Sequence, residues 1–413
     1  MSQAELRKLP DGWRWVRLGE VCKFKRGPFG GSLRKEIFVK DGYKVYEQQH
    51  AIRNNFEIGH YFISEEKYSE MLDFSIKPND LIISCSGTMG KVAIVPDDVK
   101  PGIINQALLK LTPNTGIAVS SFMKYILESD NIQNRYFRNT AGAAIKNVAP
   151  VSLLKTMPIP LPPLPEQRRI AAILNEQMAA VEKAQAAAEV QREAAKILPS
   201  AYLRKVFKCR TNDKLPGGWR WVRLGEVCEE KTGTRDPCLQ PVDMFCYIDI
   251  ASVDNNQKRI LNTSVLLGKD APSRARQVIN AGDVIVSTTR PNLNAVALVP
   301  HELDNQICST GFCVLRPKKE LERDFLFAYV CSPDFVKNLS DLVKGALYPA
   351  VTDKQVKAQV IPLPPLPEQK RIAAIIDEQM AEADKLYEFA SGQLGTIKSL
   401  PAALLRQAFG GGL

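Results

Sequence analysis

Two long stretches of this 413-residue chain carry a repeat that alternates between spacings of four and three residues. In the first stretch the repeat falls on Ile170, Leu174, Gln177, Val181, Ala184, Ala188, Gln191, Ala195 and Leu198. In the second it falls on Ile372, Ile376, Gln379, Ala383, Leu386, Ala390, Gln393, Ile397 and Leu400. A spacing that averages 3.5 residues is typical of a left-handed coiled coil. The pattern predicts two long helices that pair along these seams, with the glutamines fixing the register.

Each predicted helix begins at a proline run and meets another proline near its end. The runs lie in two matching blocks, Leu161–Leu174 and Leu363–Ile376. Closely spaced prolines favour an extended chain, and the last proline suits a first helical turn. A helix from 166 to 198 would be about 50 Å long at ~1.5 Å per residue, which is long for one domain. Pro199 and Pro401 are expected to stop or kink the helices. The alternative is that each helix packs only on its own globular domain.

The duplication extends beyond the helices. The opening segment Leu9–Cys22 returns almost unchanged as Leu215–Cys228. The unit of about two hundred residues is therefore an opening segment, a globular insert, a proline run and a long helix. Between these matching parts the two inserts share only scattered landmarks, among them Asp80 with Asp283 and Pro96 with Pro300. One scaffold with two different inserts is the simplest interpretation.

Short apolar runs in the inserts predict strands, at residues 80–84 and 91–95 in the first and 283–287 and 295–299 in the second. Helices are expected at 119–129 and 323–331. Each insert is interpreted as a compact α+β domain with polar loops at one end. The predicted domains are 1–157 (first head), 158–210 (proline run and first long helix), 211–360 (second head) and 361–413 (proline run and second long helix).

Composition indicates the charge of a partner and the cellular compartment to expect. The formal net charge of +10 makes an acidic partner plausible. We find no run of eighteen or more apolar residues and no signal peptide, so we expect a cytoplasmic protein without membrane segments. The nine cysteines lack the spacing of disulfide or zinc scaffolds and are expected to be reduced.

The sequence offers little catalytic chemistry. Residues 87–91 (Gly-Thr-Met-Gly-Lys) only faintly resemble a phosphate-binding loop. The three histidines have no metal-ligand spacing to one another, and a Gly-x-Ser-x-Gly elbow is absent. Both Pro-Pro pairs precede leucine, so the Asn/Asp-Pro-Pro-aromatic tetrapeptide of amino-methyltransferases is missing. A binding protein is therefore favoured over an enzyme, with no metal site in this chain.

Signals for nucleic-acid binding are found in both inserts. Between residues 23 and 53 the first insert has eight basic residues against three acidic ones, interleaved with aromatics that include Phe29. Glycines in residues 26–32 would let this loop approach a phosphate backbone closely. In the second insert, residues 273–276 and 288–292 offer arginine and asparagine, which read guanine and adenine edges. The alternative for the first insert is a solvated loop over core aromatics.

These motifs together resemble the specificity (S) subunit of type I restriction-modification systems. The resemblance rests on Trp-x-x-x-x-Leu-Gly-Glu-Val in each opening segment, on the repeated Leu-Pro-Pro-Leu-Pro-Glu-Gln block, and on the two-fold architecture. The first insert is similar to a target-recognition domain of the Gly-Pro-Phe-Gly-Gly-Ser type (27–32), with Ser-Gly-Thr-Met-Gly-Lys at 86–91. The second insert resembles the type with Ser-Thr-Thr-Arg-Pro at 287–291 and Ser-Thr-Gly-Phe at 309–312.

The resemblance implies a fold and a division of labour. Two α/β target-recognition domains would be separated by a two-helix antiparallel coiled coil, with an internal two-fold pseudo-repeat. Each domain would read one half of a bipartite double-stranded DNA target, and the coiled coil would set the gap. Two methyltransferase (M) subunits would bind the helical frame, and restriction (R) subunits would join them. S-adenosylmethionine, ATP and Mg would be cofactors of those partners.

Particular residues are expected to carry these contacts. DNA contacts are predicted for Lys25, Arg34, Ser86, Thr88, Lys91 and Lys146 in the first half, and for Arg274, Arg276, Thr288, Arg290, Asn292 and Asn294 in the second. An alternative for the 86–91 turn, including nearby Asp80, is a structural role. Partner contacts are predicted for Gln167, Arg168, Arg169, Gln369, Lys370 and Arg371.

Two other classes of function remain open at this point. One is a methyltransferase or nuclease that acts alone, and the other is a coiled-coil adaptor with two protein-binding heads. Binding of S-adenosylmethionine or metal-dependent cutting by the isolated chain would indicate the former. Salt-sensitive binding to duplex DNA would exclude the latter.

Overall fold

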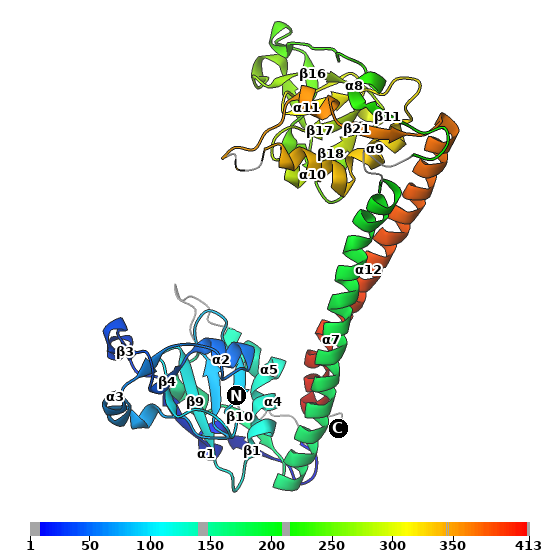
Figure 1. Ribbon diagram of the computed structural model, residues 1–413. Helices are drawn as coiled ribbons and strands as arrows, with labels where there is room; N and C mark the ends of the chain where they lie inside the picture. Colours follow the sequence, from blue (N-terminus) through cyan, green and yellow to red (C-terminus); the bar gives the residue numbers. More distant parts are fainter. Residues whose placement is uncertain (1–8, 139–147, 209–214, 344, 346, 411–413) are drawn as a thin grey trace. The chain divides into compact units, whose positions relative to one another are not determined.

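The computed structural model describes residues 9–138, 148–208, 215–343, 345 and 347–410. The chain divides into two compact units (Figure 1). The first consists of Met1–Ala188 with Gln393–Leu413, and the second of Glu189–Gly392. Each unit therefore combines one head with parts of both long helices.

The duplicated segments form the same small frame in both units. In the first unit β1 (Arg14–Arg17) pairs antiparallel with β10 (Pro158–Leu161), so the opening segment lies beside the proline run. In the second, β11 (Arg220–Arg223) pairs in the same register with β21 (Val360–Leu363). The short helices α1 (Leu18–Val21) and α8 (Leu224–Val227) follow directly. Each head thus begins and ends on one two-stranded ribbon.

The first head contains two four-stranded sheets. The order in one is β2 (Cys22–Arg26), β9 (Leu108–Pro113), β6 (Leu81–Ser84) and β7 (Val92–Ile94), all antiparallel. The order in the other is β3 (Phe38–Val39), β5 (Phe62–Ile63), β4 (Tyr43–Tyr46) and β8 (Gly102–Ile104). The helices are α2 (Gln48–Arg53), α3 (Glu65–Glu70), α4 (Ser120–Glu128), α5 (Asp130–Ile132) and α6 (Val151–Lys155). Apolar residues of α4, including Phe122 and Ile126, pack with Leu109 and Ile83 of the first sheet in one core.

The second head has a different arrangement of strands. A three-stranded sheet has the order β18 (Val296–Leu298), β17 (Val284–Ser287) and β20 (Phe312–Leu315). A four-stranded sheet has the order β15 (Ser264–Leu267), β12 (Met244–Ile248), β19 (Gln306–Ser309) and β16 (Ala275–Ile279), and β13 (Val253–Asp254) pairs with β14 (Arg259–Ile260). The helices are α9 (Arg323–Val330), α10 (Pro333–Asp341) and α11 (Asp353–Lys357). The strands and helices predicted in both inserts are confirmed to within about two residues.

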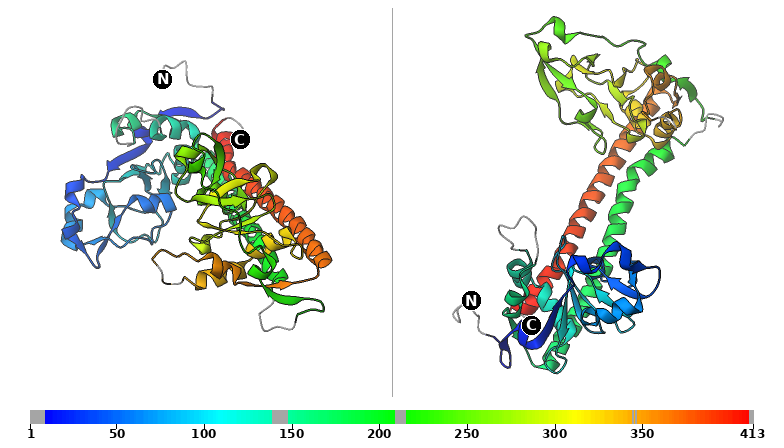
Figure 2. Two further views of the ribbon diagram at one scale, coloured as in Figure 1. Left: turned by 90° about the horizontal axis from the view of Figure 1, so that it is seen from above. Right: turned by 90° about the vertical axis from the view of Figure 1, so that its left-hand side faces the viewer.

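The long helices α7 (Leu164–Val206) and α12 (Leu366–Gly410) pair antiparallel, as each unit shows by itself. In the first unit Ile170 and Leu174 near the start of α7 share a core with Leu405 near the end of α12. In the second, Leu203 near the end of α7 shares a core with Ile376 near the start of α12. Figure 2 shows these helix segments side by side within each unit. The helices pair as predicted and also pack on the heads, so the alternative that each helix packs only on its own domain is wrong.

The two prolines are expected to stop or kink the helices, and the stop is wrong because both helices run through them. An internal proline removes one backbone hydrogen bond and costs roughly 3 kcal/mol. Beyond the prolines, Leu203 in α7 and Phe207 directly after this helix are buried, and so are Leu405 and Ala408 in α12. Burying large apolar side chains contributes about 1.5–3 kcal/mol each, so this packing offsets the lost hydrogen bond.

The seam has the predicted period, but its second position is displaced by one residue. Leu174, Val181, Ala188 and Ala195 are buried as predicted, and so are Ile376, Ala383 and Ala390. Gln177, Ala184, Gln191 and Gln393 are exposed, whereas their neighbours Met178, Gln185 and Arg192 are half-buried and Leu394 is buried. Leu386 and its neighbour Tyr387 are both exposed. This register places Met178 and Leu394 in the interface and leaves three glutamines in water, which favours it over the predicted one.

Candidate nucleic-acid interface

Backbone hydrogen bonds hold the loop that follows β17 in the second head. The amide and the hydroxyl of Thr288 both donate to the carbonyl of Gly311, each at 2.8 Å. The amide of Val351 donates to the carbonyl of Thr288 at 2.8 Å, and the amide of Arg290 donates to the carbonyl of Pro349 at 2.8 Å. The loop is therefore fixed between two neighbouring segments, and its outward side chains project from a rigid backbone.

The predicted DNA-binding side chains of this loop fall into two groups. Arg290 and Asn292 are exposed, and Arg290 and Asn294 adopt left-handed conformations with φ of 48° and 47°. Thr288 is only 7% exposed and its hydroxyl is already used by Gly311. The prediction for the Thr288 side chain is therefore corrected to a structural role. The Asn294 amide donates to the carbonyl of Cys331 at 3.4 Å, which anchors the end of the loop.

The two other predicted arginines lie near the same turn. Arg274 is exposed, and its carbonyl accepts a hydrogen bond from the amide of Thr310 at 2.9 Å. Gly311, which follows Thr310, provides the carbonyl that accepts the two hydrogen bonds from Thr288 in the β17 loop. Arg276 is half-buried and pairs with Asp236 at 3.4 Å. The structure thus brings the backbones of Arg274 and the β17 loop together, while the Arg276 guanidinium has an internal partner.

In the first head two loops leave the four-stranded sheet at the same end. Strands β2 and β6 both lie antiparallel to β9; β2 ends opposite Leu109 and β6 ends opposite Leu108. The amide of Gly27 donates to the carbonyl of Leu108 at 2.9 Å, and Ser84 is the register partner of Leu108. A Cβ on Gly27 would lie 1.8 Å from the carbonyl oxygen of Asn105, so only glycine fits this close approach. Residues 27–32 and 85–91 therefore form neighbouring loops.

The 86–91 loop combines structural and exposed residues. The Ser84 hydroxyl donates to the carbonyl of Thr88 at 2.6 Å and accepts from the amide of Lys91 at 3.1 Å, which fixes the turn. Ser86 is half-buried and its hydroxyl donates to Oε1 of Gln48 at 3.2 Å. The side chains of Thr88 and Lys91 are exposed. The turn is thus held structurally by Ser84, and two of its predicted contacts face solvent.

The remaining predicted residues of the first head have different surroundings. Lys25 pairs with Asp73 at 2.7 Å, and its ammonium lies 4.5 Å from the centre of the Phe74 ring. The hydrogen bond from Lys25 lowers the pKa of the Asp73 carboxyl. Arg34 is exposed, and Lys146 lies outside the described residues. To contact a DNA phosphate, Lys25 would have to give up its ion pair with the Asp73 carboxylate.

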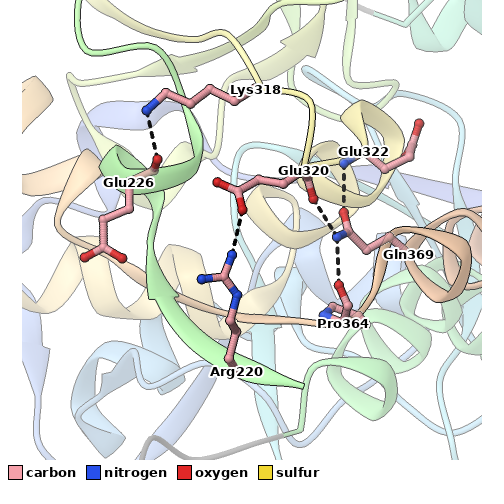
Figure 3. Close-up of polar contacts among 7 residues, drawn as sticks. All are labelled: Arg220, Glu226, Lys318, Glu320, Glu322, Pro364 and Gln369. Carbon is pink, nitrogen blue, oxygen red and sulfur yellow. Dashed lines mark hydrogen bonds and ion pairs between the residues drawn. The ribbon is translucent and has the colours of Figure 1, made fainter. Parts of the chain in front are cut away.

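The buried Gln369 joins the frame to the second head (Figure 3). Its Oε1 accepts from the amide of Glu322 at 2.8 Å, and its Nε2 donates to the carbonyls of Glu320 and Pro364, each at 2.9 Å. Gln167 makes the matching set in the first unit, with the amide of Val119 (2.8 Å) and the carbonyls of Ile117 (2.9 Å) and Pro162 (2.8 Å). We call these two sets the glutamine clasps.

The clasps correct part of the predicted partner surface. Gln167 and Gln369 are 0% exposed, so their side chains hold the long helices to the heads and do not face a partner. Arg168 and Lys370 are exposed. Arg169 pairs with Glu166 at 2.8 Å and Arg371 with Glu368 at 2.7 Å along the helix surface. Hydrogen bonding within these pairs lowers the pKa of Glu166 and of Glu368.

Large apolar side chains are exposed beside these loops. Phe29, which stands in the basic and aromatic stretch, is 93% exposed. In the second head Leu347 and Tyr348 are 88% and 84% exposed, and neither was predicted from the sequence to bind DNA. The available signal was two large apolar residues between Gly345 and Pro349, in a stretch without helical or strand periodicity.

Within the described part of the chain, no cluster of three or more His, Cys, Asp or Glu side chains could hold a metal ion. The same described residues contain no helix that is long and apolar enough to span a membrane.

The family model and the known proteins that are similar to this chain agree with one another. Residues 10–192 and 216–386 match the family model described as the type I restriction modification DNA specificity domain. The MjaVIII specificity subunit of Methanocaldococcus jannaschii, a type I restriction enzyme chain, is 24% identical over 92% of this chain and 88% of its own length. The EcoKI specificity subunit of Escherichia coli is 23% identical over 98% of this chain and 90% of its own.

Solved structures agree with these relatives. A structure described under complex assembly and conformational transition of the type I R-M system is 26% identical, with a TM-score of 0.77 over 99% of this chain and all of that chain. The HsdS subunit from Thermoanaerobacter tengcongensis is 25% identical, with a TM-score of 0.65 over 99% of both chains.

Proposed function

This chain belongs to the family of type I restriction modification DNA specificity domains, and we propose that its two heads each read one half of a bipartite target on duplex DNA. As a specificity subunit of a type I restriction-modification system, it supplies DNA recognition and no catalysis of its own. Such subunits bind DNA and assemble with other subunits. A methyltransferase or nuclease that acts alone, or a protein-binding adaptor, finds no support in these relatives.

The observation that carries the proposal is the contrast between a duplicated frame and unlike loops. The ribbon β1–β10 and the ribbon β11–β21 have the same register, and both glutamine clasps make the same three hydrogen bonds. The loops that follow β6 and β17 have different sequences and different partners. One frame with two different loop sets is what recognition of two different half-sites requires.

Within each head the exposed polar side chains divide by the contact they can make. Arg290 and Asn292 have the donors and acceptors that read guanine and adenine edges. Lys91 and Arg34 in the first head, and Arg274 in the second, are cations suited to phosphate oxygens. Phosphate contacts would position each head, and base contacts would specify the sequence.

The long helices would set the distance between the half-sites. At ~1.5 Å per residue, the 43 residues of α7 span about 65 Å, or roughly two DNA turns of ~34 Å. Their exposed surface, including Arg168 and Lys370, is the proposed docking site for two methyltransferase subunits, which restriction subunits would join. S-adenosylmethionine, ATP and Mg would serve those partners, and the assembly would act on DNA in the cytoplasm.

Methylation sequencing tests this function directly. The full chain is expressed with its methyltransferase subunits in a host that lacks the system, and the methylated motifs are compared with those of a host that lacks only this chain. We expect one bipartite motif, with two short specific words and a fixed gap, that depends on this chain. Methylation that is unchanged without the chain, or a motif with one continuous word, would contradict the proposal.

A further inference from the structure

Tyr348 and Leu347 form an apolar tip on the second head. Both side chains are more than four-fifths exposed, whereas the other described Phe, Tyr and Trp residues of this head are buried or half-buried. Neighbouring exposed apolar side chains on a protein of known binding function mark a contact surface more often than isolated ones do. The tip therefore needs an explanation that core packing does not provide.

The tip is tied to the loop that carries Arg290. The segment immediately after it runs alongside this loop, because Thr289 forms a β-bridge with Ala350. The Arg290 amide donates to the carbonyl of Pro349, the residue that follows Tyr348, at 2.8 Å. On the other side, the Val351 amide donates to the loop at 2.8 Å. These contacts place an aromatic ring and an exposed guanidinium on adjacent backbone segments.

We propose that Tyr348, supported by Leu347, stacks against a base of the half-site read by the second head. This inference rests on the proposed function and names a residue that contacts a base at that site, where stacking adds affinity without reading the base edge. An aromatic face contacts a base without needing hydrogen bonds, and apolar side chains that enter DNA unstack a base step. Arg290 beside it attracts the nucleic acid and contacts its edges or phosphates.

The tyrosine is well suited to this role. Its ring offers a large contact area with only two rotatable side-chain bonds, so little conformational entropy is lost on binding. Pro349, the next residue, has a fixed φ and its carbonyl is held by Arg290, which restricts the backbone that presents the ring. A rigid aromatic beside a rigid arginine loop forms a contact that is ready before DNA arrives.

The test uses the full chain assembled with its methyltransferase subunits and a duplex with the motif found by methylation sequencing. Tyr348→Ala is expected to weaken binding by about 5- to 150-fold, the range that corresponds to loss of base–aromatic stacking. Tyr348→Phe keeps the ring and is expected to bind like the unchanged chain. Leu239→Ala is a matched control, because Leu239 is also exposed on this head at 81%.

A fluorescent base analogue separates stacking from other effects. With 2-aminopurine placed in turn at each position of the second half-site, we expect one position to brighten on binding and to lose that change in Tyr348→Ala. Unchanged affinity and fluorescence in Tyr348→Ala would overturn the proposal, and so would a loss of subunit assembly with DNA binding intact. If the unchanged complex ignores the duplex, the proposed function itself fails.

Discussion

The frame of the first head and the frame of the second are nearly identical, whereas their recognition loops are held in different ways. The three hydrogen bonds of one glutamine clasp differ from those of the other by at most 0.1 Å. Beyond the frame, the buried Asp80 accepts a hydrogen bond from Thr112 at 2.5 Å, but its counterpart Asp283 accepts two from Arg316 at 2.8 and 2.7 Å.

This difference indicates which parts of the duplicated chain can change in sequence and which keep their geometry. Residues that join a head to the long helices are repeated with their geometry. The buried aspartate that directly precedes β6 or β17 is kept in both heads, but its side-chain partner has changed. Mutations should therefore have their largest effect in the shared frame, a smaller one in the divergent supports, and the smallest at the exposed contacts.

The largest expected effect is on the clasps. Gln167→Ala and Gln369→Ala each leave two carbonyls and one amide without their partner, so we expect each to lower the free energy of unfolding of its own unit by about 3 kcal/mol. Hydrogen exchange followed by mass spectrometry on the full chain would locate the loss. Gln177→Ala, at an exposed position of the same helix, should stay within about 0.5 kcal/mol. Unequal losses from the two clasp variants would refute the equivalence of the frames.

A smaller and unequal effect is expected at the two buried aspartates. Arg316→Ala leaves the Asp283 carboxylate buried without its cation, which should destabilise the second unit by about 2–3 kcal/mol, since Arg316 is itself partly exposed. Thr112→Val removes one hydrogen bond to Asp80 and should destabilise the first unit by about 1 kcal/mol. Denaturant unfolding, monitored separately in each unit, compares the loss in free energy of unfolding of the two variants. Equal losses would mean that the two supports are interchangeable.

Arg290→Ala tests one recognition loop without disturbing its backbone. We expect binding to weaken by about 1–3 kcal/mol and base preference to relax in one half-site only. Competition binding against a panel of single-base changes in the target, at fixed salt, gives both quantities. An equal loss on every sequence, with a reduced salt slope, would identify Arg290 as a phosphate contact.

Phe29→Ala is expected to have the smallest effect, about 1–2 kcal/mol in binding and confined to the other half-site. The ring stands exposed in a loop at the sheet end where the 86–91 loop also begins. Leu72→Ala, exposed on the same head, is the matched control and should bind normally. The same competition panel checks the result, and a shift in the half-site assigned to Arg290 would show that the loops are not separate readers.

Local patterns predicted much of this fold. The 3.5-residue spacing indicated two paired helices, and short apolar runs located β6, β7, β17 and β18. The same spacing could not distinguish Gln177 from Met178 as the seam residue, because either one lies between Leu174 and Val181 and keeps the average spacing at 3.5 residues. The burial of Gln167 depends on backbone groups fifty residues away, which a local pattern does not contain. Exposure of Tyr348 likewise follows from the absence of long-range packing.

The end of α12 has a consequence for the synthesis of the chain. Phe409 packs edge-to-face on Phe122 with ring centres 5.7 Å apart, and Arg406 pairs with Asp130 at 2.7 Å. Domains of a growing polypeptide generally fold in the order in which they leave the ribosome. Here the first head completes these contacts only after the end of α12 has been translated, since Arg406 follows Asp130 by 276 residues. A chain that stops before Arg406 would thus lack contacts of its earliest-made head.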